Sequence, residues 1–132
     1  MDKTEITMEF GLNSKSVNIV WNCISTILGL SKWLADEVTQ EGDKLVFTWG
    51  DIWTRIETRT ATIISIEKYQ YVRLKWDDDD DESYFWEMKI GRSHETDDLH
   101  LIIIDYADSD DEDGLKEIWT HNIEKLHKAS GI

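Results

Sequence analysis

The sequence predicts one α+β domain in which a curved antiparallel sheet encloses a long C-terminal helix on its concave side. Apolar and polar residues alternate in several segments between Asp43 and Tyr106, a period typical of strands with one buried face. Apolar residues also recur at helical spacing near both ends of the chain. A meander of strands and one amphipathic helix bury their apolar surfaces together when the sheet curls around the helix.

The composition is that of a folded and strongly acidic domain. The chain has 132 residues, the usual length of one domain, and we expect residues 1–132 to form a single unit. Seven tryptophans and an apolar content of 40% argue against disorder. The formal net charge of −14 makes nucleic acids and anionic membranes poor partners, because both attract basic surfaces. We therefore expect no nucleic-acid partner and no membrane partner.

Other features of the sequence favour a cytoplasmic protein. The N-terminus has no charged and then apolar signal segment, and no apolar run is long enough to span a membrane. The single cysteine, Cys23, excludes an internal disulfide. These observations together predict a cytoplasmic location.

The N-terminal segment is predicted to begin with a strand and a helix. Residues 4–11 alternate, with apolar side chains on one side. Ser14 or Ser16 is a suitable cap for a helix over residues 17–28, in which apolar residues recur at helical spacing.

A second short helical turn is expected after this helix. Gly29 is predicted to break the first helix, and residues 30–34 have the apolar spacing of one further turn. Residues 36–42 are expected to form a loop or a short strand.

The middle of the chain is predicted to form a meander of five or six strands. From Asp43 onward apolar residues alternate, and glycine or acidic residues separate the segments. The predicted strands are residues 45–49, 53–66 (one strand, or two joined by a bulge), 69–76, 84–91 and 99–106, with turns at Gly50–Asp51 and Asp77–Ser83.

The C-terminal segment is predicted to be the long helix. Asp108 or Ser109 is a suitable N-terminal cap, and Gly131 is a suitable end. One continuous apolar stripe is formed by Leu115, Ile118, Trp119, Ile123 and Leu126.

Four segments, in order along the chain, resemble those of a known family. They are Ile24-Ser25-Thr26 with Gly29–Val38 (GLSKWLADEV), Leu45–Gly50 (LVFTWG), Val72–Trp76 (VRLKW) and Leu99–Ala107 (LHLIIIDYA). On these segments the chain resembles the START-like (SRPBCC) superfamily, in particular bacterial single-domain members related to the activator of the heat-shock-90 chaperone ATPase. Ile27 and Leu34 depart from the family pattern, in which proline and phenylalanine are usual, but both keep an apolar side chain.

The resemblance implies the fold more narrowly than the function. It implies a helix-grip fold: a curved antiparallel sheet of six or seven strands, two short N-terminal helices, and a long C-terminal helix packed in the concave face. The superfamily includes lipid carriers, hormone receptors, polyketide cyclases and chaperone regulators, so the fold alone does not determine the function.

Aromatic and apolar side chains on the helix side of the sheet are candidates for a ligand cavity. Large rings with a flexible methionine can line an apolar cavity for a lipid-like or aromatic ligand. The same rings can equally fill the space completely. The candidate residues are Phe47, Trp49, Leu74, Trp76, Trp86, Met88, Leu101, Trp119 and Ile123.

The opposite, convex face of the predicted sheet is also partly apolar. Arg73 is expected to form an exposed ion pair with Glu87 across two strands. A solvent-facing sheet surface is usually more polar than this one, so we expect a homodimer contact or a protein partner to cover it. The candidate interface residues are Tyr71, Phe85, Ile102 and Ile104.

Three functions remain open at this point. The favoured one is non-catalytic binding of a small hydrophobic or lipid-like ligand. The alternatives are a protein-interaction module resembling the chaperone-ATPase activator domain and a cyclase-type enzyme. The enzyme is disfavoured because the inward-pointing polar candidates, Thr48 and Asp105, have no evident acid–base partner.

Acidic clusters and histidines lack the spacing of metal sites. The run Asp77–Glu82 is expected to be a solvated hairpin tip. Asp108–Gly114 does not place glycine and glutamate where a calcium loop requires them. Glu117 and His121 share a helix face without a further suitably spaced set of ligands. We expect neither a metal nor a cofactor.

Overall fold

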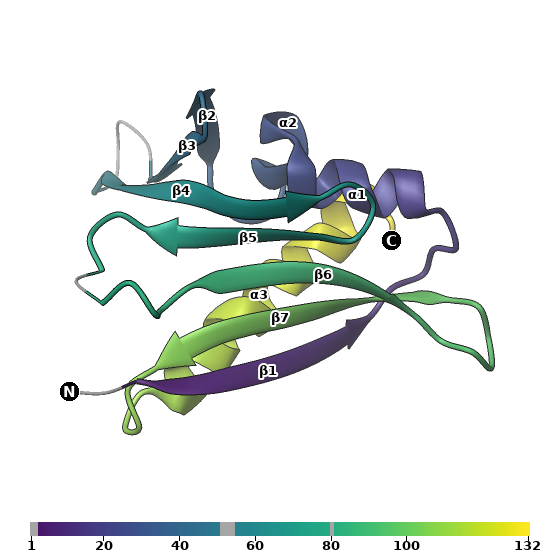
Figure 1. Cartoon of the computed structure of the whole chain (residues 1–132). Helices are drawn as coiled ribbons and strands as arrows, with labels where there is room; N and C mark the ends of the chain where they lie inside the picture. Colours follow the sequence, from purple (N-terminus) through teal and green to yellow (C-terminus); the bar gives the residue numbers. More distant parts are fainter. Residues whose placement is uncertain (1–2, 51–54, 80) are drawn as a thin grey trace.

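Seven strands and three helices make up the described part of the chain, which is residues 3–50, 55–79 and 81–132 of a computed structural model (Figure 1). In chain order they are β1 (Thr4–Gly11), α1 (Val17–Ser25), α2 (Ile27–Leu30), β2 (Glu37–Glu41), β3 (Lys44–Trp49), β4 (Glu57–Glu67), β5 (Tyr71–Trp76), β6 (Trp86–Arg92), β7 (Leu99–Ala107) and α3 (Glu112–Ser130).

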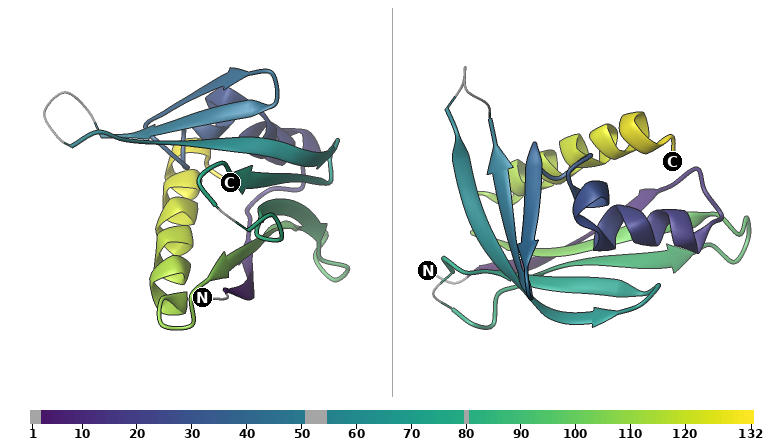
Figure 2. Two further views of the ribbon diagram at one scale, coloured as in Figure 1. Left: turned by 60° about the vertical axis from the view of Figure 1, so that its left-hand side comes forward. Right: turned by 90° about the horizontal axis from the view of Figure 1, so that it is seen from above.

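All seven strands belong to one antiparallel sheet with the order β1-β7-β6-β5-β4-β3-β2. Strands β2 and β3 run across the direction of β5, β6 and β7, and β4 pairs with β3 along its first half and with β5 along its second, so the sheet is strongly curved; α3 crosses its concave side (Figure 2). The predicted fold class is confirmed: the curved antiparallel sheet, the two short N-terminal helices and the long C-terminal helix are all present.

The long helix α3 begins later than predicted. Asp108 accepts a hydrogen bond at its carbonyl from the backbone N–H of Asp111 (2.9 Å), which closes a turn before the helix starts. Asp111 is the residue before the first turn, and its side chain makes no capping bond. The predicted end is correct, because Gly131 has φ = 75° and donates its N–H to the carbonyl of His127 (2.9 Å).

The break between the two short helices lies at Thr26. The sequence predicts it three residues later, at Gly29. Ser16 caps α1, while Thr26 ends α1 and accepts a hydrogen bond from the N–H of Gly29 (2.9 Å) at its hydroxyl. Gly29 lies inside α2, at a position where a side chain does not fit. A Cβ atom at this position would overlap the backbone oxygen of Asn22 and lie 2.8 Å from the Cα atom of Cys23.

The strand boundaries differ from the prediction by a few residues. Of the two forms expected for residues 36–42, a loop or a short strand, residues 37–41 form the strand. β5 starts only at Tyr71, because Tyr69 has φ = 68° in the turn before it. β6 starts at Trp86, two residues later than expected, and β4 contains a bulge between Ile63 and Ser65.

Three predicted features involve residues outside the described part of the chain. They are the start of the strand predicted at 53–66, the second residue of the Gly50–Asp51 turn, and Asp80 within the Asp77–Ser83 tip.

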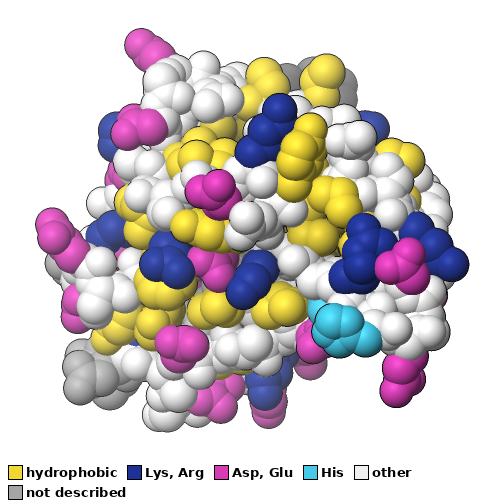
Figure 3. Space-filling view, turned by 45° about the vertical axis from the view of Figure 1, so that its right-hand side comes forward, with side chains coloured by type: hydrophobic (Ala, Val, Ile, Leu, Met, Phe, Trp, Pro, Cys, Tyr) yellow, Lys and Arg dark blue, Asp and Glu magenta, His cyan; other side chains and the backbone are white. Residues whose placement is uncertain are grey.

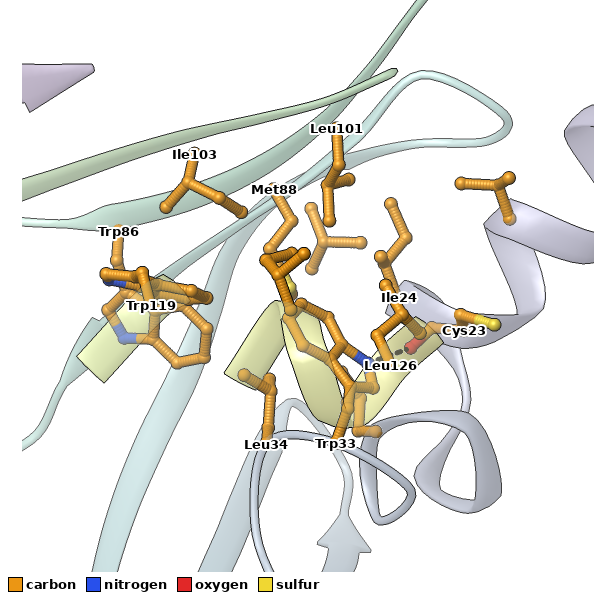
Figure 4. Close-up of a cluster of buried hydrophobic side chains, with 14 of the residues drawn as sticks. Cys23, Ile24, Trp33, Leu34, Trp86, Met88, Leu101, Ile103, Trp119 and Leu126 are labelled. Atoms are coloured by element: carbon orange, nitrogen blue, oxygen red, sulfur yellow. Dashed lines mark hydrogen bonds between the residues drawn. The ribbon is translucent and has the colours of Figure 1, made fainter. Parts of the chain in front are cut away.

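The hydrophobic core joins α1, α3 and the sheet around Trp33 (Figure 4). Trp33 is almost fully buried, and its Nε1 donates to the carbonyl of Cys23 (2.9 Å). Leu126 packs into the same cluster together with Met88 and Leu101 from the sheet. Of the predicted helical stripe, Ile118 is the exception: it is 59% exposed and lies at the edge of the helix contact.

Replacing Gly29 with alanine is expected to destabilise the fold. Alanine normally stabilises a helix relative to glycine by about 1 kcal/mol. Here the added methyl group meets the backbone of α1, so we expect the free energy of unfolding to fall by roughly 1–3 kcal/mol. Urea unfolding followed by circular dichroism measures the change.

The matched control is Gly11→Ala at the end of β1. A Cβ atom there meets nothing within 4 Å, so the free energy of unfolding should change by less than about 0.5 kcal/mol. Equal stability of Gly29→Ala and the wild type would contradict the close approach of the two helices.

Candidate functional site

A cavity of about 330 Å³ lies between the N-terminal half of α3 and the concave face of the sheet, and it is partly open to solvent. Strands β3 to β7 and the segment before β2 form one side, and α3 forms the other. The lining residues are Leu34, Phe47, Trp49, Glu57, Arg59, Trp76, Trp86, Asp105, Leu115, Ile118, Trp119 and Asn122.

Aromatic rings form the wall of this cavity. Phe47 and Trp49 point to the same side of β3 and stack on each other, with ring centroids 6.1 Å apart and an interplanar angle of 18°. Phe47 meets Trp76 edge-on at 5.5 Å, and Trp76 stacks on Trp86 at 5.1 Å. Trp119 of α3 approaches Trp86 at 6.0 Å. The rings of three strands and one helix thus touch in a continuous series.

Hydrogen bonds to the protein itself fix two of these indoles. Trp49 Nε1 donates to the carbonyl of Leu34 (2.8 Å), and Trp119 Nε1 donates to Oδ2 of Asp105 (2.9 Å). Trp86 is only 2% exposed, and within the described part of the chain its buried Nε1 has no hydrogen-bond partner.

Asp105 is the half-buried carboxylate of the site. It lies on the concave side of β7, and it accepts hydrogen bonds from Trp119 Nε1 and from the N–H of Tyr106 (2.8 Å). Burial raises the pKa of the Asp105 carboxyl above its ordinary value, although both hydrogen bonds act in the opposite direction. Lys3 also lowers this pKa, and Asp79 raises it.

Thr48, the other polar residue predicted to point inward, does not do so. Its neighbours Phe47 and Trp49 point to the concave side, and side chains alternate along a strand, so Thr48 faces the convex side.

Arg59 lies at the cavity wall and was not predicted there. Its guanidinium group lies 4.0 Å from the centroid of the Trp76 ring, and it donates to both carboxylate oxygens of Asp78 (2.8 and 3.2 Å). Glu57 lines the same wall two residues earlier in β4. The alternation of residues 57, 59, 61 and 63 could have identified both, because Ala61 and Ile63 lie on the same face.

Five of the nine predicted cavity residues line the cavity. They are the aromatic ones: Phe47, Trp49, Trp76, Trp86 and Trp119. The other four, Leu74, Met88, Leu101 and Ile123, are buried in the hydrophobic core. Additional lining residues from α3 are Leu115, Ile118 and Asn122.

The acidic hairpin tip is not simply solvated, contrary to the prediction. Asp77 pairs with Lys44 (2.8 Å), Asp78 with Arg59, and Asp79 with Lys3 (3.2 Å). The hydrogen bonds from Lys44 and from Arg59 are the main reasons why the pKa values of Asp77 and Asp78 are lowered. Basic residues from three different segments converge on the tip, which sequence spacing does not reveal. Asp81 and Glu82 are exposed, as expected.

A second, smaller cavity of about 200 Å³ lies beside the first and shares Arg59, Trp76, Trp86, Asp105 and Leu115 with it. Its remaining wall is more polar and comes from the N-terminal segment, the hairpin tip and the start of α3. These further residues are Lys3, Asp79, Tyr84, Phe85, Tyr106, Ala107, Asp108 and Asp111.

The predicted interface residues lie together on the convex face and are half-buried: Tyr71, Phe85, Ile102 and Ile104. Charged and hydrophobic side chains alternate in small areas on this side of the molecule (Figure 3).

The ion pair on this face forms as predicted, with Arg73 Nε 2.9 Å from Glu87 Oε1. It is not exposed, however, because Glu87 is only 4% accessible. The guanidinium group of Arg73 also lies over the ring of Phe85, 4.4 Å from its centroid.

Two kinds of feature are absent from the described residues. No group of three His, Cys, Asp or Glu side chains is arranged to hold a metal ion. None of the helices in the described ranges is long and apolar enough to cross a membrane.

Comparisons with known proteins identify the family. A family model described as a START-like superfamily domain matches residues 1–132. The comparison with curated proteins found no match. A protein from Bacteroides fragilis with a solution NMR structure is 38% identical, with a TM-score of 0.65 over 97% of this chain and 91% of its own.

More distant solved structures share the fold. The Aha1 dimer from Colwellia psychrerythraea has 11% identity and a TM-score of 0.71, and 96% of both chains is covered. A protein from Chromobacterium violaceum has 12% identity and a TM-score of 0.72, with the same coverage of both chains. With the family match over its whole length and the fold described above, the chain belongs to the START-like superfamily.

Proposed function

We propose that this START-like domain binds a small, largely apolar ligand in the cavity between α3 and the sheet. The observation that carries the proposal is the aromatic wall around a space of about 330 Å³. Ligand cavities in proteins start at about this size, are mostly apolar and contain a few polar groups that orient the ligand. This volume suits a ligand with one or two rings or a short chain.

The wall is held in place before any ligand arrives. Trp49 and Trp119 are each fixed by a hydrogen bond to the protein, and Phe47 is in contact with three further rings. A preformed site loses little conformational entropy when a ligand binds, which favours affinity.

The proposed role is binding without chemical change. Asp105 is a half-buried acid of the cavity, and both of its oxygens already accept hydrogen bonds. Besides Asp105, the titratable residues that line the larger cavity in the described ranges are Arg59, which is paired with Asp78, and Glu57, which lies on β4, three strands away from β7 in the sheet. General acid–base catalysis needs a second group within hydrogen-bond reach of the reacting atoms. We therefore assign to Asp105 the role of positioning Trp119.

A second candidate function is protein contact through the convex face, either between two copies or with another protein, as in an activator-type interaction module. The observation that favours it is that β7 carries apolar side chains on both faces, with Ile102 and Ile104 on the convex one. The related fold from Colwellia psychrerythraea is described as a dimer. A cytoplasmic location remains a prediction from the sequence.

Filling the cavity is expected to prevent binding. Asn122→Trp places an indole at the cavity wall and should weaken the binding of prodan, a neutral naphthalene dye, by at least about tenfold. Fluorescence titration measures the affinity. Lys125→Trp adds the same group to the exposed side of α3 and should leave the affinity unchanged. Absence of prodan binding to the wild type, or equal weakening by both variants, would contradict the proposed site.

Asp105→Asn is expected to change how stability depends on pH. The folded state raises the pKa of Asp105, so stability linked to this proton is complete below the unfolded-state pKa of about 4. It is lost as the pH rises through the raised folded-state value. Urea unfolding from pH 4 upward should therefore show the variant becoming more stable relative to the wild type across this window.

The control for this experiment is Asp110→Asn, which changes an exposed acid in the connection between β7 and α3. Its stability should follow the wild-type pH curve. A curve for Asp105→Asn that also ran parallel to the wild type would show that Asp105 is not buried as described.

The second candidate function predicts a dimer that Ile102→Asp disrupts. Burying a new carboxylate in an apolar contact is strongly unfavourable, so the variant should sediment as a monomer at concentrations where the wild type is dimeric. Thr39→Asp, on an exposed position of the distant edge strand β2, should leave the dimer intact. A wild type that is monomeric at high concentration would exclude the homodimer.

A further inference from the structure

We propose that the ligand of the cavity is an organic cation, whose ammonium group binds among the aromatic rings near the carboxylates of Asp105 and Glu57. This inference rests on the proposed function and specifies the chemical class of the ligand.

Two of the tryptophans in the cavity wall have no free hydrogen-bond donor. The N–H donors of Trp49 and Trp119 are already used by Leu34 and Asp105. Phe47 has no donor, and the Nε1 of Trp86 is buried. Trp49, Trp119 and Phe47 therefore offer a ligand their ring surfaces rather than hydrogen-bond donors. Ring faces carry partial negative charge and attract cations.

A cationic side chain of the protein already lies against one ring of this wall. The guanidinium of Arg59 lies 4.0 Å from the centroid of the Trp76 ring, well within the distance of a cation–π interaction. The chain's own side chain thus demonstrates the kind of group that this surface accepts.

The described residues that line the two adjoining cavities include more unpaired acids than unpaired bases. Both lining cations are already paired with acids of the hairpin tip, Lys3 with Asp79 (3.2 Å) and Arg59 with Asp78 (2.8 Å). In contrast, the lining carboxylates without a cationic partner among the described residues are Glu57, Asp105, Asp108 and Asp111.

This imbalance favours a positively charged ligand. An anionic ligand would be repelled by the unpaired carboxylates, and a neutral ligand would leave them uncompensated. The net charge of −14 also raises the local concentration of small cations near the protein. Arg59 opposes a second cation, but its charge is largely balanced by the two hydrogen bonds to Asp78.

Three probes of nearly equal shape test the inference. Choline is the cation, 3,3-dimethylbutan-1-ol is its neutral counterpart, and 3,3-dimethylbutanoate is an anion. Titration at low salt and pH 8, followed by the NMR signals of the indole N–H groups, gives the three affinities. We expect choline to bind about five- to tenfold more tightly than the alcohol, and the anion to bind weakest.

A pair of variants in β4 tests the contribution of charge. Glu57→Gln removes a lining carboxylate and should weaken choline binding about threefold without affecting the alcohol. Glu67→Gln removes an exposed carboxylate at the other end of the same strand and should change neither affinity.

The outcomes separate the two proposals. If the alcohol binds as tightly as choline, or Glu57→Gln and Glu67→Gln behave alike, the cationic ligand is excluded while the apolar cavity still binds ligands. If none of the three probes binds and prodan does not bind either, the proposed function fails together with this inference.

Discussion

The packing of α3 against the concave face of the sheet is the interaction on which the cavity depends. At the C-terminal end of the helix, Ile123 and Leu126 are buried together with Trp33, so the layers are in full contact. Towards its N-terminal end, Leu115 is only half-buried and Ile118 is mostly exposed. The cavity lies where this contact opens. The tight half of the interface therefore supplies the stability that lets the other half remain partly empty.

Polar contacts of the tryptophans keep the open half from collapsing. A cavity walled by flexible apolar side chains tends to close, because the lining atoms gain dispersion contacts when they move together. Here Trp119 is restrained by Asp105 and Trp49 by the backbone of Leu34. Burying the Asp105 carboxylate is unfavourable, as its raised pKa indicates. The hydrogen bond from Trp119 to the same carboxylate orients an aromatic ring that lines the cavity.

The sequence predicted which face of the sheet a side chain lies on better than it predicted where helices and strands begin, or which distant residues form ion pairs. Alternation placed Phe47, Trp76 and Trp86 on one side of the sheet, because a period of two follows directly from strand geometry. It misplaced the start of α3, since the turn at Asp108 competes with the helix. The partners of the acidic tip could not be predicted. Lys3 is separated from Asp79 by 76 residues, and only the curvature of the complete sheet brings them together.

The ion pairs of the acidic tip also affect the charge around the cavity. Six consecutive acidic residues at a hairpin tip repel one another, which would favour an extended, solvated loop. The structure relieves this repulsion by pairing three of them with Lys3, Lys44 and Arg59. Two of these cations border the cavities, and pairing leaves them little free charge to attract an anionic ligand. The tip therefore helps to determine the charge of the neighbouring cavity as well as its own conformation, and under our proposal the remaining carboxylates and ring faces attract a positively charged ligand.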